Sequence, residues 1–123
     1  MLKKKKKLHV LNLTGVITAS TSRVGLLKEK EFDLEEVLDF LHDLQEEEPE
    51  KTAGLILRID SPGGTTGASE EVARELVKVR ERGIYTVASI ADVCCSGAYW
   101  IASCADCIFA NSTSMTGSIG VIM

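Results

Sequence analysis

Apolar and polar positions along this chain follow patterns that predict three strands and a loop. The segment LHVLNLTGVIT, residues 8–18, alternates apolar and polar positions around residues that favour strands. The run AGLILRID, residues 53–60, is almost continuously apolar, which is typical of a strand buried on both faces of a parallel sheet. IYTVASIAD, residues 84–92, predicts a third strand, and the stretch 18–30, rich in Ser, Thr and Lys, predicts a loop.

Helical periodicity separates these strands. Asp33 can cap a helix, with Glu36 placed three residues later to complete the first turn. Apolar residues then recur at helical spacing before Pro49: Leu34, Val37, Leu38, Leu41 and Leu44. A second helix is predicted over 68–82, and a short apolar one begins near Ser96. Alternating strands and helices favour an α/β fold, a parallel sheet with right-handed crossovers.

Two turns that follow predicted strands are the candidates for chemistry. SPGG, residues 61–64, combines a proline with Gly63 and Gly64, which leave amide N–H groups uncovered; it is either an oxyanion-binding turn or an ordinary strand-to-helix turn. CCSGA places Ser96 before a helix, where a serine is either a nucleophile or an N-cap. Acyl transfer needs a nucleophile and amide donors about 3 Å from one carbonyl, so the turns complement each other.

A serine nucleophile also needs a general base, and the residues offer none that is convincing. His42 lies among the polar positions of the first predicted helix and is interpreted as a solvated surface residue, and His9 is no better placed. Asp60 and Asp92 end strands, where carboxylates commonly bond neighbouring amides. Four lysines lie in loops or exposed helical settings, where they stay charged: Lys28, Lys30, Lys51 and Lys78.

Length, composition and charge limit the kinds of protein that this chain can be. The chain has 123 residues, of which 45% are hydrophobic, as in one globular domain. Its net charge is −4 and most of its basic excess is crowded into Lys3–Lys7, so we expect no nucleic-acid partner. That lysine run is either a solvated end or a contact for anionic membranes. The sequence has neither an apolar run of about 20 residues nor a signal peptide, so we expect the chain to be soluble.

The chain has four cysteines, which are Cys94, Cys95, Cys104 and Cys107. Two special interpretations are open for them, a disulfide framework or a metal site. A domain of this size needs no disulfides, and the first two cysteines lack the spacing of a zinc-binding pair. We therefore interpret all four as small buried apolar side chains. No metal is predicted.

Three segments together resemble a known family: LHVLNLTGVIT, GLILRIDSPGG and IADVCCSGAYWIASCADCIFANSTSMTGSIGV. In order and spacing they are similar to the signal peptide peptidase A family, the S49 serine peptidases of the Clp/crotonase fold. The resemblance spans nearly the whole chain but only part of the family's catalytic domain. It implies a lysine-rich end at 1–7 and the N-terminal part of an S49-type domain at 8–123.

The resemblance also implies roles for individual residues. Ser96 falls on the family nucleophile, and backbone amides would form the oxyanion hole: Gly63, Gly64 and Gly97. Ser118, in the loop TGSIG, would support the site by orienting a lysine. Tyr99 and Trp100 are expected either in the core, at a subunit contact, or in the lining of a substrate pocket.

Family members use a Ser/Lys dyad whose lysine lies well downstream of TGSIGV, whereas this sequence ends at Met123. We therefore expect the general-base lysine beyond Met123 and an inactive isolated chain. The implied protein is an endopeptidase of cleaved signal peptides or other apolar peptides, without cofactors, a homo-oligomer anchored to the membrane by a segment absent here. The alternatives are a crotonase-like acyl-CoA enzyme, a non-catalytic scaffold and a phage capsid-maturation peptidase of the same family.

Overall fold

The computed structural model describes residues 5–19 and 32–120. Its elements follow in the order β1 (Lys7–Thr14), α1 (Leu34–Gln45), η1 (Pro49–Lys51), β2 (Thr52–Ser61), α2 (Thr66–Glu81), β3 (Thr86–Cys95), α3 (Gly97–Ser103), β4 (Cys107–Ala110) and β5 (Met115–Gly117). The predicted alternation of strands and helices is confirmed. Nearly all of the loop predicted at 18–30 lies outside the described residues.

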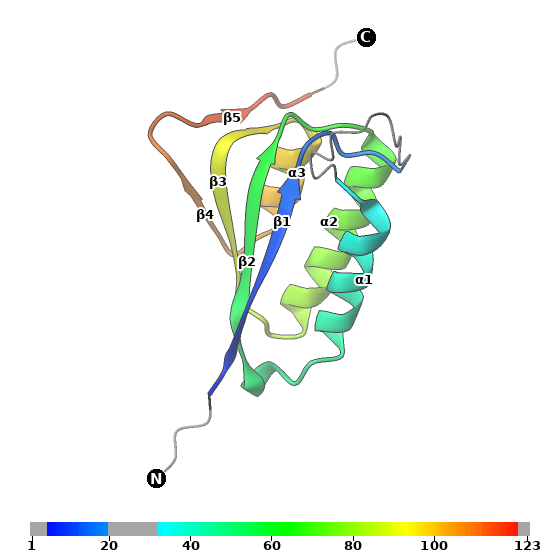
Figure 1. Cartoon of the computed structure of the whole chain (residues 1–123), viewed down its shortest axis with the longest axis vertical. Coiled ribbons are helices and arrows are strands. Elements are labelled where there is room, and N and C mark those ends of the chain that lie inside the picture. Colours follow the sequence, from blue (N-terminus) through cyan, green and yellow to red (C-terminus); the bar gives the residue numbers. More distant parts are fainter. Residues whose placement is uncertain (1–4, 20–31, 121–123) are drawn as a thin grey trace, which may run out of the picture.

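All the strand pairs are parallel, in the order β1-β2-β3-β4, and β5 pairs with the second half of β3 (Figure 1). The third strand was predicted to end at Asp92, but it continues to Cys95. The reason is tertiary: Val93 pairs with Met115 and Cys95 with Gly117, and a local pattern contains no information on so distant a partner. The longer strand leads directly into Ser96.

The core lies between one face of the sheet and the helices, which Figure 1 shows alongside it. Fully buried residues at alternate positions of β2 face this core: Leu55, Leu57 and Ile59. The second strand was predicted to be buried on both faces, and this is wrong for the described residues, because Ile56 is only half-buried and Arg58 is exposed. Their neighbours across the sheet on β1 include Val10, which is 51% exposed.

Local signals at the first helix are confirmed. Asp33 precedes α1, and its Oδ1 accepts a hydrogen bond from the Glu36 amide at 3.2 Å. The predicted apolar stripe faces the core, with Leu38 partly buried and the rest fully buried: Leu34, Val37, Leu41 and Leu44. Because this stripe packs on the sheet, the polar face of α1 is left to meet α2 and the solvent.

A buried carboxylate joins α1 to α2. Glu75 is 9% exposed and accepts hydrogen bonds from Gln45 Nε2 at 2.8 Å and Lys78 Nζ at 2.9 Å. His42 Nε2 lies 3.2 Å from the same carboxylate. The hydrogen bond from Gln45, aided by Lys78 and His42, lowers the pKa of Glu75. His42 is half exposed, as predicted, but it has an acidic partner that local spacing along α1 could not show.

Candidate active site

Ser96 has an unusual backbone at the junction of β3 and α3. Its φ is 56° and its ψ −124°, a region that non-glycine residues occupy at a cost of about 1–3 kcal/mol. The conformation is held from both sides, since the Ser96 amide donates to Gly117 O at 3.0 Å and the Ser96 carbonyl accepts from the Trp100 amide at 3.1 Å. Strain of this kind concentrates at functional sites.

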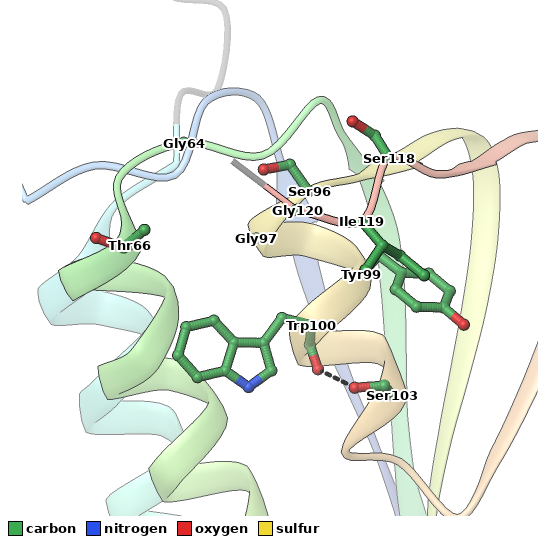
Figure 2. A pocket seen from close by; sticks show the side chains of 10 residues that line it. All are labelled: Gly64, Thr66, Ser96, Gly97, Tyr99, Trp100, Ser103, Ser118, Ile119 and Gly120. Atoms are coloured by element: carbon green, nitrogen blue, oxygen red, sulfur yellow. Dashed lines mark hydrogen bonds between the residues drawn. The ribbon is translucent and has the colours of Figure 1, made fainter. Parts of the chain in front are cut away.

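The Ser96 side chain does not cap the helix that follows. It makes no capping hydrogen bond with α3, and its hydroxyl has no hydrogen-bond partner among the described residues. Instead it lines a cavity (Figure 2). Of the two interpretations of this serine, the N-cap is therefore not supported, and the exposed hydroxyl leaves the nucleophile as the one still open.

The two turns lie against each other because glycines permit it. Gly63 has a φ of 102°, and a Cβ there would lie 2.8 Å from both the Cys95 carbonyl oxygen and Ser96 Cβ. At Gly97 a Cβ would collide with the side chain of Ser69, which is fully buried on α2. Any larger residue at either position would push SPGG or α2 away from Ser96.

Of the three backbone amides expected to form an oxyanion hole, one already donates a hydrogen bond within the chain. The Gly63 amide donates to Ser61 Oγ at 3.1 Å and is buried, so it is engaged within its own turn. The Gly64 and Gly97 amides donate to no group in the described part of the chain, and both residues line the same cavity as Ser96. The structure therefore leaves the Gly64 and Gly97 amides without a partner among the residues described and the Gly63 amide engaged, and the oxyanion role expected for the three stays a prediction.

The cavity beside Ser96 has a volume of about 380 Å³. It lies between the start of α2, one face of α3 and the segment after β5, and its lining is Gly64, Thr66, Ser96, Gly97, Tyr99, Trp100, Ser103, Ser118, Ile119 and Gly120. Figure 2 shows the Trp100 indole on the α2 side and the Ser103 hydroxyl turned onto the Trp100 carbonyl, to which it donates at 2.6 Å. The walls that remain are largely apolar.

Two further residues named from the sequence lie in this lining. Tyr99 is half-buried, packs against the core and also borders the cavity, while its role in a substrate pocket stays a prediction. Ser118 is exposed, has a φ of 56° and follows β5, which pairs with the strand that carries Ser96. The long-range pairing of β5 thus brings the TGSIG loop beside the turn that contains Ser96.

None of the carboxylates or lysines in the described residues lines the cavity. Asp60 Oδ1 accepts from the Val93 amide at 3.2 Å across a bulge between β2 and β3, as expected for a structural carboxylate. Lys51 pairs with Glu48, whose hydrogen bond raises the pKa of Lys51, and Lys78 pairs with Glu75. Two other lysines lie outside the described residues: Lys28 and Lys30.

All four cysteines are free thiols. Cys94 is fully buried, which confirms its interpretation as a small apolar side chain, and burial raises its pKa to about 11. The same interpretation is wrong in part for the other three, which are only half-buried: Cys95, Cys104 and Cys107. Within the described ranges there is no group of side chains placed to hold a metal ion, and no helix combines the length and apolarity needed to cross a bilayer.

The parallel sheet, its crossover helices and the two apposed turns define a Clp/crotonase-like fold. Two solved structures are similar to it. The 1510-N membrane-bound stomatin-specific protease aligns with a TM-score of 0.64 and 14% identity, over 89% of this chain and 46% of that one. An enoyl-CoA hydratase/isomerase family member aligns with a TM-score of 0.58 and 18% identity, over 72% and 42%. At these identities the likeness shows the fold alone.

Sequence similarity then points to one family, peptidase family S49. The model of that family matches residues 78–123, which hold Ser96 and Ser118. The putative signal peptide peptidase SppA of Enterococcus faecium is 35% identical over 118 residues, which are 96% of this chain and 33% of that protein. The chain thus spans about a third of the length of this curated relative.

Proposed function

We propose that this chain carries the nucleophile and the oxyanion donors of a serine endopeptidase. The observation that supports this is the strained turn at Ser96, whose unpartnered hydroxyl shares one cavity with the free amides of Gly64 and Gly97. Ser96 Oγ attacks a peptide carbonyl and gives its proton to a base, and the amides stabilise the resulting oxyanion. Expulsion of the amine, which takes up a proton, leaves an acyl-enzyme that water hydrolyses.

The base is proposed to be a lysine that follows Met123 in a longer polypeptide. The cavity has no lysine among the residues that the structure describes, so the proton acceptor has to come from elsewhere. A lysine must be unprotonated to act in this way, which requires burial against apolar walls. We assign Ser118, at the cavity edge, the role of orienting it.

The substrates are proposed to be apolar peptides, including cleaved signal peptides. Tyr99, Trp100 and Ile119 provide apolar surface next to Ser96, which suits an aliphatic or aromatic side chain of an extended peptide. The name of the relative from Enterococcus faecium is consistent with this substrate class. Assembly into a homo-oligomer and membrane association are proposals for the longer polypeptide.

The experiment is hydrolysis of a fluorogenic apolar peptide by three proteins: the 123-residue chain, the chain extended through its natural reading frame, and the extended chain with Ser96→Ala. We expect turnover only by the extended wild type, and a loss of at least about 1000-fold in the variant. Equal activity of wild type and variant would instead show that Ser96 is not the nucleophile, as in a crotonase-like enzyme, which uses amide donors without one. Absence of turnover in all three would support a scaffold.

A further inference from the structure

We propose that Ser61 is a positioning residue that aims the Gly64 amide at the oxyanion, an inference that rests on the proposed peptidase function. Ser61 ends β2 and is 1% exposed. Its hydroxyl donates to the Gly15 carbonyl at 2.6 Å and accepts from the Gly63 amide at 3.1 Å. One buried side chain therefore bridges the segment after β1 and the first glycine of the turn.

The turn is held from its other side by Ile17. The Ile17 amide donates to the Gly63 carbonyl at 2.9 Å, and the Thr65 amide donates to the Ile17 carbonyl at 2.8 Å. The amides of Gly63 and Thr65 thus donate to Ser61 and Ile17. Between them, the amide of Gly64 has no partner in the described part of the chain. Gly63 is buried and Gly64 is exposed on the cavity, which fits this division of roles.

The Ser61 hydroxyl performs both parts of the bridge with a single oxygen, because it donates and accepts at once. Without it, the partly buried Gly15 carbonyl and the buried Gly63 amide would each lack this partner, and the Gly63–Gly64 peptide could rotate to give one of them a new partner. Rotation of that peptide would turn the Gly64 amide away from the position of the oxyanion. Since an oxyanion donor acts through preorganised geometry, we expect a loss of rate with little loss of substrate binding.

The first test needs no catalysis. Amide hydrogen exchange of Gly63 and Gly64 is measured by NMR on the ¹⁵N-labelled 123-residue chain, as wild type, Ser61→Ala and Ser61→Thr. Thr86→Val is the matched control, because it removes another fully buried hydroxyl, which donates to Ile84 O at the opposite end of the sheet. Thermal unfolding first establishes that each variant folds.

We expect the Gly63 amide to exchange about 10-fold or more slower than Gly64 in the wild type, and to lose this protection in Ser61→Ala. Ser61→Thr, which keeps the hydroxyl, should retain it, and so should the Thr86→Val control. If Ser61→Thr does not fold, the comparison of Ser61→Ala with Thr86→Val still decides the question. Equal protection of Gly63 in wild type and Ser61→Ala would overturn the inference.

The second test uses the extended, active polypeptide. We expect Ser61→Ala to lower kcat by about 10- to 100-fold with KM changed less than about 2-fold, and Thr86→Val to leave both unchanged. An unchanged kcat in Ser61→Ala would refute the positioning role while leaving the peptidase proposal intact. An inactive wild type would refute the peptidase proposal, and the exchange experiment would still establish whether Ser61 holds the turn.

Discussion

Ser69 on α2 fills the space that a side chain would need at residue 97. Its hydroxyl donates to Thr65 O at 2.8 Å, and the residue is fully buried, so it cannot move aside. Close contact between α2 and the first residue of α3 therefore depends on a glycine at 97. This contact places the start of α2, and with it the SPGG turn, next to the turn that contains Ser96.

Gly97→Ala is expected to destabilise the fold by about 1–3 kcal/mol, because the new methyl group overpacks a closed contact. Chemical denaturation of wild type, Gly97→Ala, Ser69→Ala and the double variant measures this. The second substitution removes the colliding oxygen, so the double variant should be more stable than the sum of the single effects. Strict additivity would contradict the contact.

Ser96→Gly is expected to stabilise the protein and, in the extended polypeptide, to abolish the proposed turnover. Glycine adopts a φ of 56° without strain, and even after its larger entropic loss on folding we expect a gain of about 1 kcal/mol. Ser96→Ala is the control, because it also lacks the hydroxyl but keeps the strain. A higher melting temperature for the glycine variant than for the alanine variant would show that the backbone conformation carries a cost.

Glu75→Gln is expected to lower stability by about 1–2 kcal/mol at neutral pH, because hydrogen bonds to a charged acceptor are replaced by weaker ones. The pKa of Glu75 is lowered in the folded state, so its contribution is complete above the unfolded pKa of about 4.5 and is lost as the pH falls through the folded value. The difference between wild type and variant should therefore shrink in acid, as measured by denaturation from pH 7 to pH 2.

The control for that prediction is Glu71→Gln, an exposed position on the same helix. It should change stability by less than about 0.5 kcal/mol. A constant difference between wild type and Glu75→Gln across the whole pH range would show that Glu75 does not act through its charge.

Trp100 provides a direct report on the cavity, because it is the single tryptophan of the chain and is 42% exposed. Binding of an apolar peptide should shift its emission to shorter wavelength as water leaves the indole, whereas a polar peptide of equal length should not. Ser103→Phe should fill the cavity and weaken this response by about 10-fold or more. Ser112→Phe, exposed and outside the lining, should leave it unchanged.

Much of the fold follows from short-range pattern. The spacing of Leu34, Val37 and Leu41 predicted a helix that the structure confirms, and Asp33 caps it as expected. These features are set by neighbours a few residues apart, through helical periodicity and capping. The two candidate turns could also be located, since proline and glycine mark them in the sequence.

Other features depend on residues that only the folded chain brings together. The extension of β3 to Cys95 requires β5, and the strained backbone of Ser96 is held by the carbonyl of Gly117 from that same strand. The hydrogen bond donated by the Gly63 amide depends on the direction of the Ser61 side chain, whose oxygen accepts it. No local pattern contains these relationships.

The sequence by itself determined the first three strands, the three α-helices, their order and the residue types at the two turns, because each depends on local periodicity and backbone preference. The strands β4 and β5 were not predicted. The tertiary structure decided which amides stay free, which backbone is strained and which side chains share the cavity. Those outcomes rest on hydrogen bonds and close contacts between segments far apart in the chain. Their partners are selected by packing, so they appear only when the sheet and helices have assembled.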